Sequence, residues 1–232
     1  MNGFTAFHER YARVVERLVR SPLVSVTHRA SGAGVRGGAG ADVVFAELAK
    51  DSDVHLDDAF RALYFAPAEL HVAWRLTADT TTGGEFCLQN IARWSADGWG
   101  PDDWTLSGEE SDRLGELSVI DYEPRSGSGS VTGISLDDGE RPLSVGADAE
   151  IWYFDAGEHR LERLDVDYAG YLEGVLLTVG AHGWQYLFAD VNLRREVNPH
   201  TVADLERMLG ALPEILPGHD HEPLRRRFDA RC

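Results

Sequence analysis

The stretch YAGYLEGVLLTVGAHGWQYLFADV, residues 168–191, constrains the fold more than any other part of the chain. Apolar side chains recur from Tyr168 to Val179 at intervals of three and four residues, which is the spacing of one face of an α-helix. After a break at 180–183, the helical spacing resumes at 184, 187, 188 and 191. A helix with one apolar face that follows strand-like runs has to bury that face against a sheet. We therefore expect helices over this stretch to cover the apolar face of a sheet.

Other segments give the order of the remaining elements. Runs typical of strands occupy 23–28, 70–77, 85–94, 116–123, 149–155 and 159–166. An amphipathic stripe predicts a helix over 4–20, Asp57 would cap a short helix that ends at Pro67, and Thr201 would cap a later helix that Gly210 closes. Residues 43–50 fit either a strand or a helical turn. Strands followed by helices predict an α+β fold with one antiparallel sheet of about five or six strands, helices on one face, and helical arms at both ends.

The same pattern suggests three parts in the chain. Residues 1–40 hold a helix, a strand and a glycine-rich loop, and residues 41–195 hold the α+β core. Residues 196–232 hold a further helix and a tail whose periodicity is weak, so we expect the tail to be partly mobile.

Charge excludes several classes of partner. The formal net charge is −17, and such a surface repels phosphate backbones and anionic membranes. It attracts a protein with a basic surface and speeds the encounter with it. The N-terminal stripe carries Glu and Arg, so it predicts neither a signal peptide nor a membrane span. Two cysteines without a partner motif suit the cytoplasm. The number of subunits stays open.

Two glycine-rich runs come close to catalytic or cofactor-binding motifs without matching them. Gly32-x-Gly34-x-x-Gly37 matches the spacing of a dinucleotide fingerprint, but the first glycine does not directly follow a strand and no ordered helix start follows the third. The SGSGS run at 126–130 lacks the spacing of a nucleophile elbow. We therefore assign no catalytic residue and no cofactor, and the chain favours a non-enzymatic role.

Histidines offer two weaker candidate sites. His219 and His221 lie on one side of an extended segment and are a possible metal pair, although a stable site needs three or four ligands. In a second hypothesis the protein is a small-molecule enzyme or a ligand-binding accessory protein of a biosynthetic pathway. Its pocket would lie between the 168–191 helices and the sheet, with His182, Tyr186 and Asp190 around it.

A tryptophan-rich acidic segment gives the clearest signal for a binding surface. Trp94, Trp99 and Trp104 recur every five residues, with Asp97, Asp102 and Asp103 between them. Tryptophan is favoured as an interface anchor, and neighbouring acids would suit a cationic partner. The alternative is that the rings fold back over a sheet edge.

The run AEIWYFDAGEHRLERLDVDYAGYLEGVLL, residues 149–177, resembles the end of SUKH superfamily domains, the Smi/Knr-like proteins. There an aromatic strand turns back into a second strand, and an acidic-aromatic step, here Asp167-Tyr168, leads into a helix. The DDAFRALYFAPAEL run at 57–70 is similar to the helix that precedes the first strands of that family. The resemblance covers roughly residues 45–190, and the glycine-rich acidic turn of the family is not recognisable.

That resemblance implies an α+β domain, mostly without enzymatic activity, which binds other proteins as a toxin-immunity or regulatory module. Together with the charge and the tryptophans, it leads to our first hypothesis. The chain is expected to be a bacterial, cytoplasmic, non-enzymatic module that binds a basic protein. The ligand-binding role is the second hypothesis, and assembly through the N-terminal helix is the third.

Overall fold

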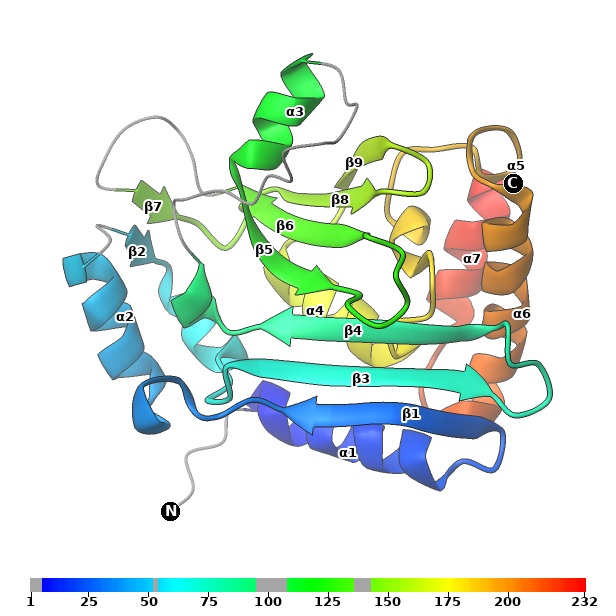
Figure 1. Ribbon diagram of the computed structural model, residues 1–232, viewed down its shortest axis with the longest axis horizontal. Helices are drawn as coiled ribbons and strands as arrows, with labels where there is room; N and C mark the ends of the chain where they lie inside the picture. The colour runs from blue at the N-terminus through cyan, green and yellow to red at the C-terminus, as the bar shows by residue number, and fades with distance from the viewer. Residues whose placement is uncertain (1–5, 52–53, 95–107, 136–142) are drawn as a thin grey trace.

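The computed structural model describes residues 6–51, 54–94, 108–135 and 143–232, and its fold is α+β with two antiparallel sheets (Figure 1). The first sheet has three strands in the order β1-β3-β4, and the second has four in the order β5-β6-β8-β9. A parallel pair, β2 and β7, lies apart from both. The strands are β1 Val24–Ser31, β2 Val54–Leu56, β3 Glu69–Leu76, β4 Gly83–Gln89, β5 Leu117–Tyr122, β6 Val131–Ser135, β7 Leu143–Val145, β8 Ile151–Asp155 and β9 Arg160–Leu164.

Helices lie behind and beside the two sheets (Figure 1). The α-helices are α1 Ala6–Arg20, α2 Ala41–Asp51, α3 Gly108–Gly115, α4 Tyr168–Thr178, α5 Leu193–Glu196, α6 Pro199–Ile215 and α7 Glu222–Arg231. Four 3-10 helices complete the described elements: η1 Val35–Gly37, η2 Asp58–Leu63, η3 Ile91–Arg93 and η4 Trp184–Leu187. The undecided segment 43–50 is therefore helical, within α2. Asp57 caps η2 as expected, because its Oδ1 accepts the Ala59 amide at 2.7 Å.

The single sheet expected from the sequence is split between β4 and β5. These strands are neighbours, but the outer edge of β4 is bound by other groups. The Glu85 amide donates to the Gly180 carbonyl at 2.8 Å, and the His182 amide donates to the Gly83 carbonyl at 3.1 Å. Further along, the Cys87 amide donates to the carboxylate of Asp121 at 2.7 Å. The backbone groups that would have joined the two sheets into one are therefore already used.

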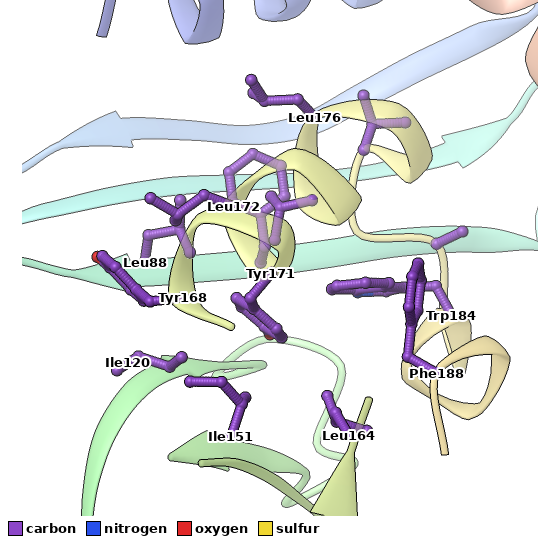
Figure 2. Packing of buried hydrophobic residues seen from close by; sticks show 14 of the residues in the cluster. Leu88, Ile120, Ile151, Leu164, Tyr168, Tyr171, Leu172, Leu176, Trp184 and Phe188 are labelled. Atoms are coloured by element: carbon purple, nitrogen blue, oxygen red, sulfur yellow. The ribbon is translucent and has the colours of Figure 1, made fainter. Parts of the chain in front are cut away.

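Helix α4 fills the angle between the two sheets, as the spacing at 168–179 predicts (Figure 2). Its buried side chains include Tyr168, Tyr171, Leu172, Val175 and Leu176. They meet Leu88 of β4 on one side and Ile120, Ile151 and Leu164 of the four-stranded sheet on the other. The helix begins where the sequence predicts, because the Asp167 carboxylate accepts the Gly170 amide at 2.7 Å.

The second half of that stretch differs from the expectation. Residues 184–187 form the 3-10 helix η4 and not an α-helix, since the Tyr186 and Phe188 amides bond to carbonyls three residues back. Its side chains are nonetheless buried, and the Trp184 ring packs against Tyr171 of α4 with centroids 5.0 Å apart.

The C-terminal region contains more helix than the sequence suggested. Asn198, and not Thr201, caps α6, because its side chain accepts the His200 amide and Pro199 occupies the first turn. The helix also runs past Gly210 to Ile215. The tail, expected to be partly mobile, forms α7, which buries Leu224 and Phe228 and packs on η4.

One apolar core serves most of the molecule. The main cluster of buried side chains draws on α1, α4, α6, α7 and both antiparallel sheets. It therefore takes residues from all three predicted parts of the chain, whose boundaries stay a prediction. In the described ranges, no helix has both the length and the apolar character needed to cross a membrane.

Strand β1 is the outer strand of its sheet, and its pairing with β3 is irregular. The register shifts between Val26 and His28, which indicates a bulge. The exposed fraction of the side chains alternates along the strand, and Arg29 and Ser31 are exposed.

Gly174 provides a test of the packing between α4 and η4. A Cβ atom at this position would lie 2.4 Å from the buried Trp184 ring, so we expect Gly174→Ala to lower the free energy of unfolding by about 1–3 kcal/mol through overpacking. Gly210 of α6 has nothing within 4 Å of a built Cβ, so Gly210→Ala should raise it by about 0.5–1 kcal/mol. Urea denaturation of both variants measures the difference, and equal effects at the two sites would contradict this packing.

Candidate functional site

The front face of the three-stranded sheet carries polar side chains where its back face carries the core. Leu70, Val72 and Trp74 of β3 belong to the core cluster, so the intervening His71 and Arg75 project to the opposite face. The ladder places Cys87 opposite His71 and Glu85 opposite Ala73, on that same front face. The loop between β5 and β6 crosses in front of β4 here (Figure 1). We call this region, between β4 and that loop, the seam.

Glu85 fixes the loop to the sheet. Its carboxylate is buried and accepts the Arg125 amide at 2.9 Å and the Ser126 amide at 2.6 Å, while Nε2 of His71 lies 2.7 Å from Oε1. Burial raises the pKa of Glu85, but the hydrogen bonds from His71 and the two amides outweigh burial and leave the pKa lowered. The charged form of Glu85 is therefore the form that these contacts stabilise.

Asp121 connects the two sheets from the other side of the seam. It belongs to β5 and accepts a backbone amide of β4. Besides the Cys87 amide, its carboxylate accepts the Tyr171 hydroxyl of α4 at 2.8 Å. Tyr171 also lies 3.0 Å from the Thr132 hydroxyl of β6. Complete burial raises the pKa of Asp121 to about 8, against the lowering effect of these hydrogen bonds. This carboxyl therefore joins β4, β5, β6 and α4 at one point.

Glu123 forms the third buried acid of the seam. Its Oε2 accepts the hydroxyls of Ser126 and Ser128, each at 3.1 Å, and lies 3.1 Å from Nδ1 of His182. Burial lowers the pKa of His182, but the hydrogen bond and the charge of Glu123 raise it more, so the net shift is upward. A nucleophilic serine needs the histidine next to it as base. Here the glutamate stands between Ser126 and the histidine, so this arrangement does not activate the serine.

A half-open cavity of about 200 Å³ lies over this cluster. Its wall includes Thr27, Arg75, Glu85, Arg125, Ser126 and His182, which come from β1, β3, β4, the loop after β5 and the turn before η4. His182 was singled out from the sequence as a ligand-pocket residue, and it does line a cavity.

The pocket predicted around His182, Tyr186 and Asp190 is not assembled. Tyr186 is fully buried, and its hydroxyl donates to Asp155 at 2.8 Å, at the β8–β9 turn. Asp190 is exposed, and neither residue lines the cavity at His182. The reason is local: the left-handed turns at Val179, Gly180 and Gly183 and the 3-10 geometry of η4 aim these side chains in different directions.

Trp94 belongs to the core and not to a binding surface. It is 3% exposed, and its ring meets Phe60 and Tyr168 edge-on, with centroids 5.8 and 5.1 Å away. For this residue the prediction of a contact surface is wrong, and the alternative of inward packing is confirmed. The other residues of the predicted surface, Asp97, Trp99, Asp102, Asp103 and Trp104, lie outside the described residues.

The candidate metal pair lies beside a cation. His219 and His221 have ring centroids 6.2 Å apart, and Nη1 of Arg17 lies 3.4 Å from Nδ1 of His219. Burial lowers the pKa of His221. Within the ranges that the structure describes, no three His, Cys, Asp or Glu side chains are grouped so as to hold a metal ion.

A second surface combines acids with a tryptophan that the sequence reasoning missed. Trp152 of β8 is half-buried beneath α3, where its indole nitrogen donates to Glu150 at 3.2 Å. The Arg113 guanidinium lies over the same ring at 5.6 Å, and Glu116 pairs with Arg113 at 3.2 Å. Exposed Glu109 and Asp112 continue the acidic charge along α3. We call Glu109, Asp112, Glu116, Glu150 and Trp152 the acidic face.

Strand periodicity could have found this residue. In the run IWYFD, residues two apart share a face. Ile151 and Tyr153 face the main core, which leaves Trp152 and Phe154 on the other face, where only a small second cluster covers them.

No protein-family model matches the chain, and comparison with curated proteins and with solved structures also finds no match. The resemblance to the SUKH superfamily therefore stays a prediction.

The raised pKa of Asp121 predicts a specific dependence of stability on pH. The folded state keeps this carboxyl protonated up to about pH 8, whereas the unfolded chain releases the proton near pH 4. The folded state thus binds more protons between these values, and its stability should fall as the pH rises through that window. Asp121→Asn keeps an acceptor for the Cys87 amide and cannot ionise. We expect it to remove a loss on the order of a few kcal/mol between pH 5 and pH 8.

Denaturant titrations at several pH values would measure this loss. The control is Asp229→Asn, which changes an exposed carboxylate on α7. If wild type and Asp121→Asn show parallel curves, Asp121 is ionised in the folded protein and the assignment is wrong.

Proposed function

We propose that this protein is a non-enzymatic binding module and that its acidic face receives a protein with a basic surface. The observation that carries the proposal is the half-buried Trp152, which bonds to Glu150 and lies under Arg113, next to the exposed acids of α3. Interface hot spots favour a tryptophan that is already held in place and ringed by polar groups.

The chemistry of the seam supports binding over catalysis. Its three buried acids are engaged by backbone amides, hydroxyls and histidines of the protein itself. Glu85 and Glu123 thereby hold a loop in place, and Asp121 holds strands and a helix together. General acid–base catalysis needs a titratable group within reach of a substrate proton, and these groups are occupied by structural hydrogen bonds.

Charge is distributed unevenly over the molecule, which supports an oriented encounter. The exposed side of α1 carries Arg10, Arg13, Arg17 and Arg20 together with Glu9 and Glu16, so it is less acidic than the α3 side. In Figure 1, α1 runs along the lower side of the molecule and α3 stands at the top. A basic partner would be drawn more strongly to the α3 side than to the α1 side, and such steering raises association rates.

The resemblance to SUKH domains gives this proposal a biological form. An immunity or regulatory module of that kind acts by occupying another protein, without chemistry of its own. Both cysteines, Cys87 and Cys232, are free thiols, which supports a reducing compartment such as the cytoplasm.

Charge reversal on α3 tests the proposal. The full chain is immobilised and exposed to lysate of its native host, and the triple variant Glu109→Lys, Asp112→Lys, Glu116→Lys is compared with wild type. We expect a captured basic protein to bind the variant at least about tenfold more weakly, and wild-type capture to decrease as salt screens the charges. The control reverses Glu206, Glu214 and Asp229 on α6 and α7, with the same change in net charge.

Trp152→Ala gives a second, uncharged test on the same face, with its thermal unfolding measured to confirm that the variant is folded. Loss of the same partner in both variants, with retention by the control, supports the acidic face. The proposal fails if the control variant loses the partner equally. It also fails if no captured protein binds the α3 variant more weakly than it binds the control variant.

A further inference from the structure

The cavity at the seam presents cationic groups in a strongly acidic protein. Arg75 comes from β3, Arg125 from the loop after β5 and His182 from the turn before η4, and all three line the same space. The chain as a whole has a formal net charge of −17. Three basic side chains that converge from distant parts of such a sequence are therefore not explained by composition.

The two acids near the cavity are engaged by groups of the protein itself. Glu85 already accepts two backbone amides and contacts His71, and its side chain is 2% exposed. Glu123 accepts two serine hydroxyls and contacts His182, with a side chain that is 6% exposed. Both oxygens of Glu85 and Oε2 of Glu123 are thus engaged within the protein, and the basic side chains of Arg75, Arg125 and His182 line the cavity beside them.

The charges of the two arginines reach the histidines around the cavity. The charge of Arg75 acts to lower the pKa of His182, and that of Arg125 acts to lower the pKa of His28. His28 lies against His71, with ring centroids 4.3 Å apart and ring planes tilted by 55°. Arg75 is held in its position, because its Nη1 donates to the Thr80 carbonyl at 2.7 Å.

His182 adds a directed donor. Nδ1 of His182 is hydrogen-bonded to the Glu123 carboxylate, so the other ring nitrogen, Nε2, is the one available to the cavity. Burial and the charge of Arg75 lower the pKa of His182, but the hydrogen bond with Glu123 and the charges of Glu123 and Glu85 raise it more, so the pKa is raised. In the protonated ring both nitrogens carry hydrogen.

We propose that the seam cavity is a binding site for a small anion that carries a carboxylate or phosphate group, held by Arg75, Arg125 and His182. A guanidinium fork matches both groups with two parallel hydrogen bonds. The volume of about 200 Å³ corresponds to roughly six or seven waters, which suits a small metabolite or one anionic end of a larger one. The site shares no residue with the acidic face, so the two proposals stand or fall separately.

Titration of the full chain with inorganic phosphate and, separately, with succinate tests the site. The ring signals of His182, assigned with His182→Gln, are followed by NMR, and thermal unfolding is recorded in parallel. We expect saturable shifts at millimolar ligand and a rise in melting temperature with at least one of the two anions. Phosphate alone, succinate alone or both would identify which anionic group the site accepts.

Variants separate a built site from general attraction to positive charge. Arg75→Gln and Arg125→Gln should each weaken binding about tenfold, and Arg125→Lys should keep part of it because it retains the charge but not the fork. Arg226→Gln, an exposed arginine of α7, is the matched control and should bind like wild type. If neither anion shifts His182, or if Arg226→Gln weakens binding as much as the seam variants do, the site does not exist.

Discussion

Hydrogen bonds from backbone amides to two buried carboxyl groups across the seam are the contacts on which the rest of the structure depends. Asp121 of β5 accepts an amide of β4, and Glu85 of β4 accepts two amides of the loop that follows β5. This exchange replaces a strand ladder, because buried amides must find acceptors somewhere. It also lets the two sheets separate enough for α4 to fill the angle between them. The price is a buried Asp121 whose ionisation the fold disfavours, so one interaction sets both the architecture and its response to pH.

The sequence was sufficient for elements whose signals are local. The stripe on α4, the cap Asp57 and the strand runs of β3, β4, β8 and β9 all follow from spacing and capping within a few residues. The split of the sheet could not be foreseen, because it depends on Cys87 meeting Asp121 across more than thirty positions. The same limit applies to α7. Its apolar periodicity is weak, and the helix is packed on η4, which lies far away in the sequence.

The prediction of site residues was limited in the same way, because local signals identified single residues but not their distant partners. His182 was identified because it stands between two apolar faces, yet its partners Glu123, Arg75 and Arg125 lie far away in the sequence and gave no joint signal. Trp94 misled because tryptophan in a polar context suggests a surface, whereas contacts with Phe60 and Tyr168 bury it. Trp152 was overlooked inside a strand that reads as continuously apolar. Its exposure depends on how little of the outer sheet face α3 covers.

The bulge in β1 has a consequence for how the molecule behaves among its own copies. β1 is a terminal strand, and an outer strand offers backbone donors and acceptors to any passing extended chain. The register shift between Val26 and His28 disrupts the even spacing that an incoming strand would need, and the exposed Arg29 places charge on the same strand. The irregularity thus guards against edge-to-edge aggregation, so a substitution that straightened β1 would endanger solubility before it endangered the fold.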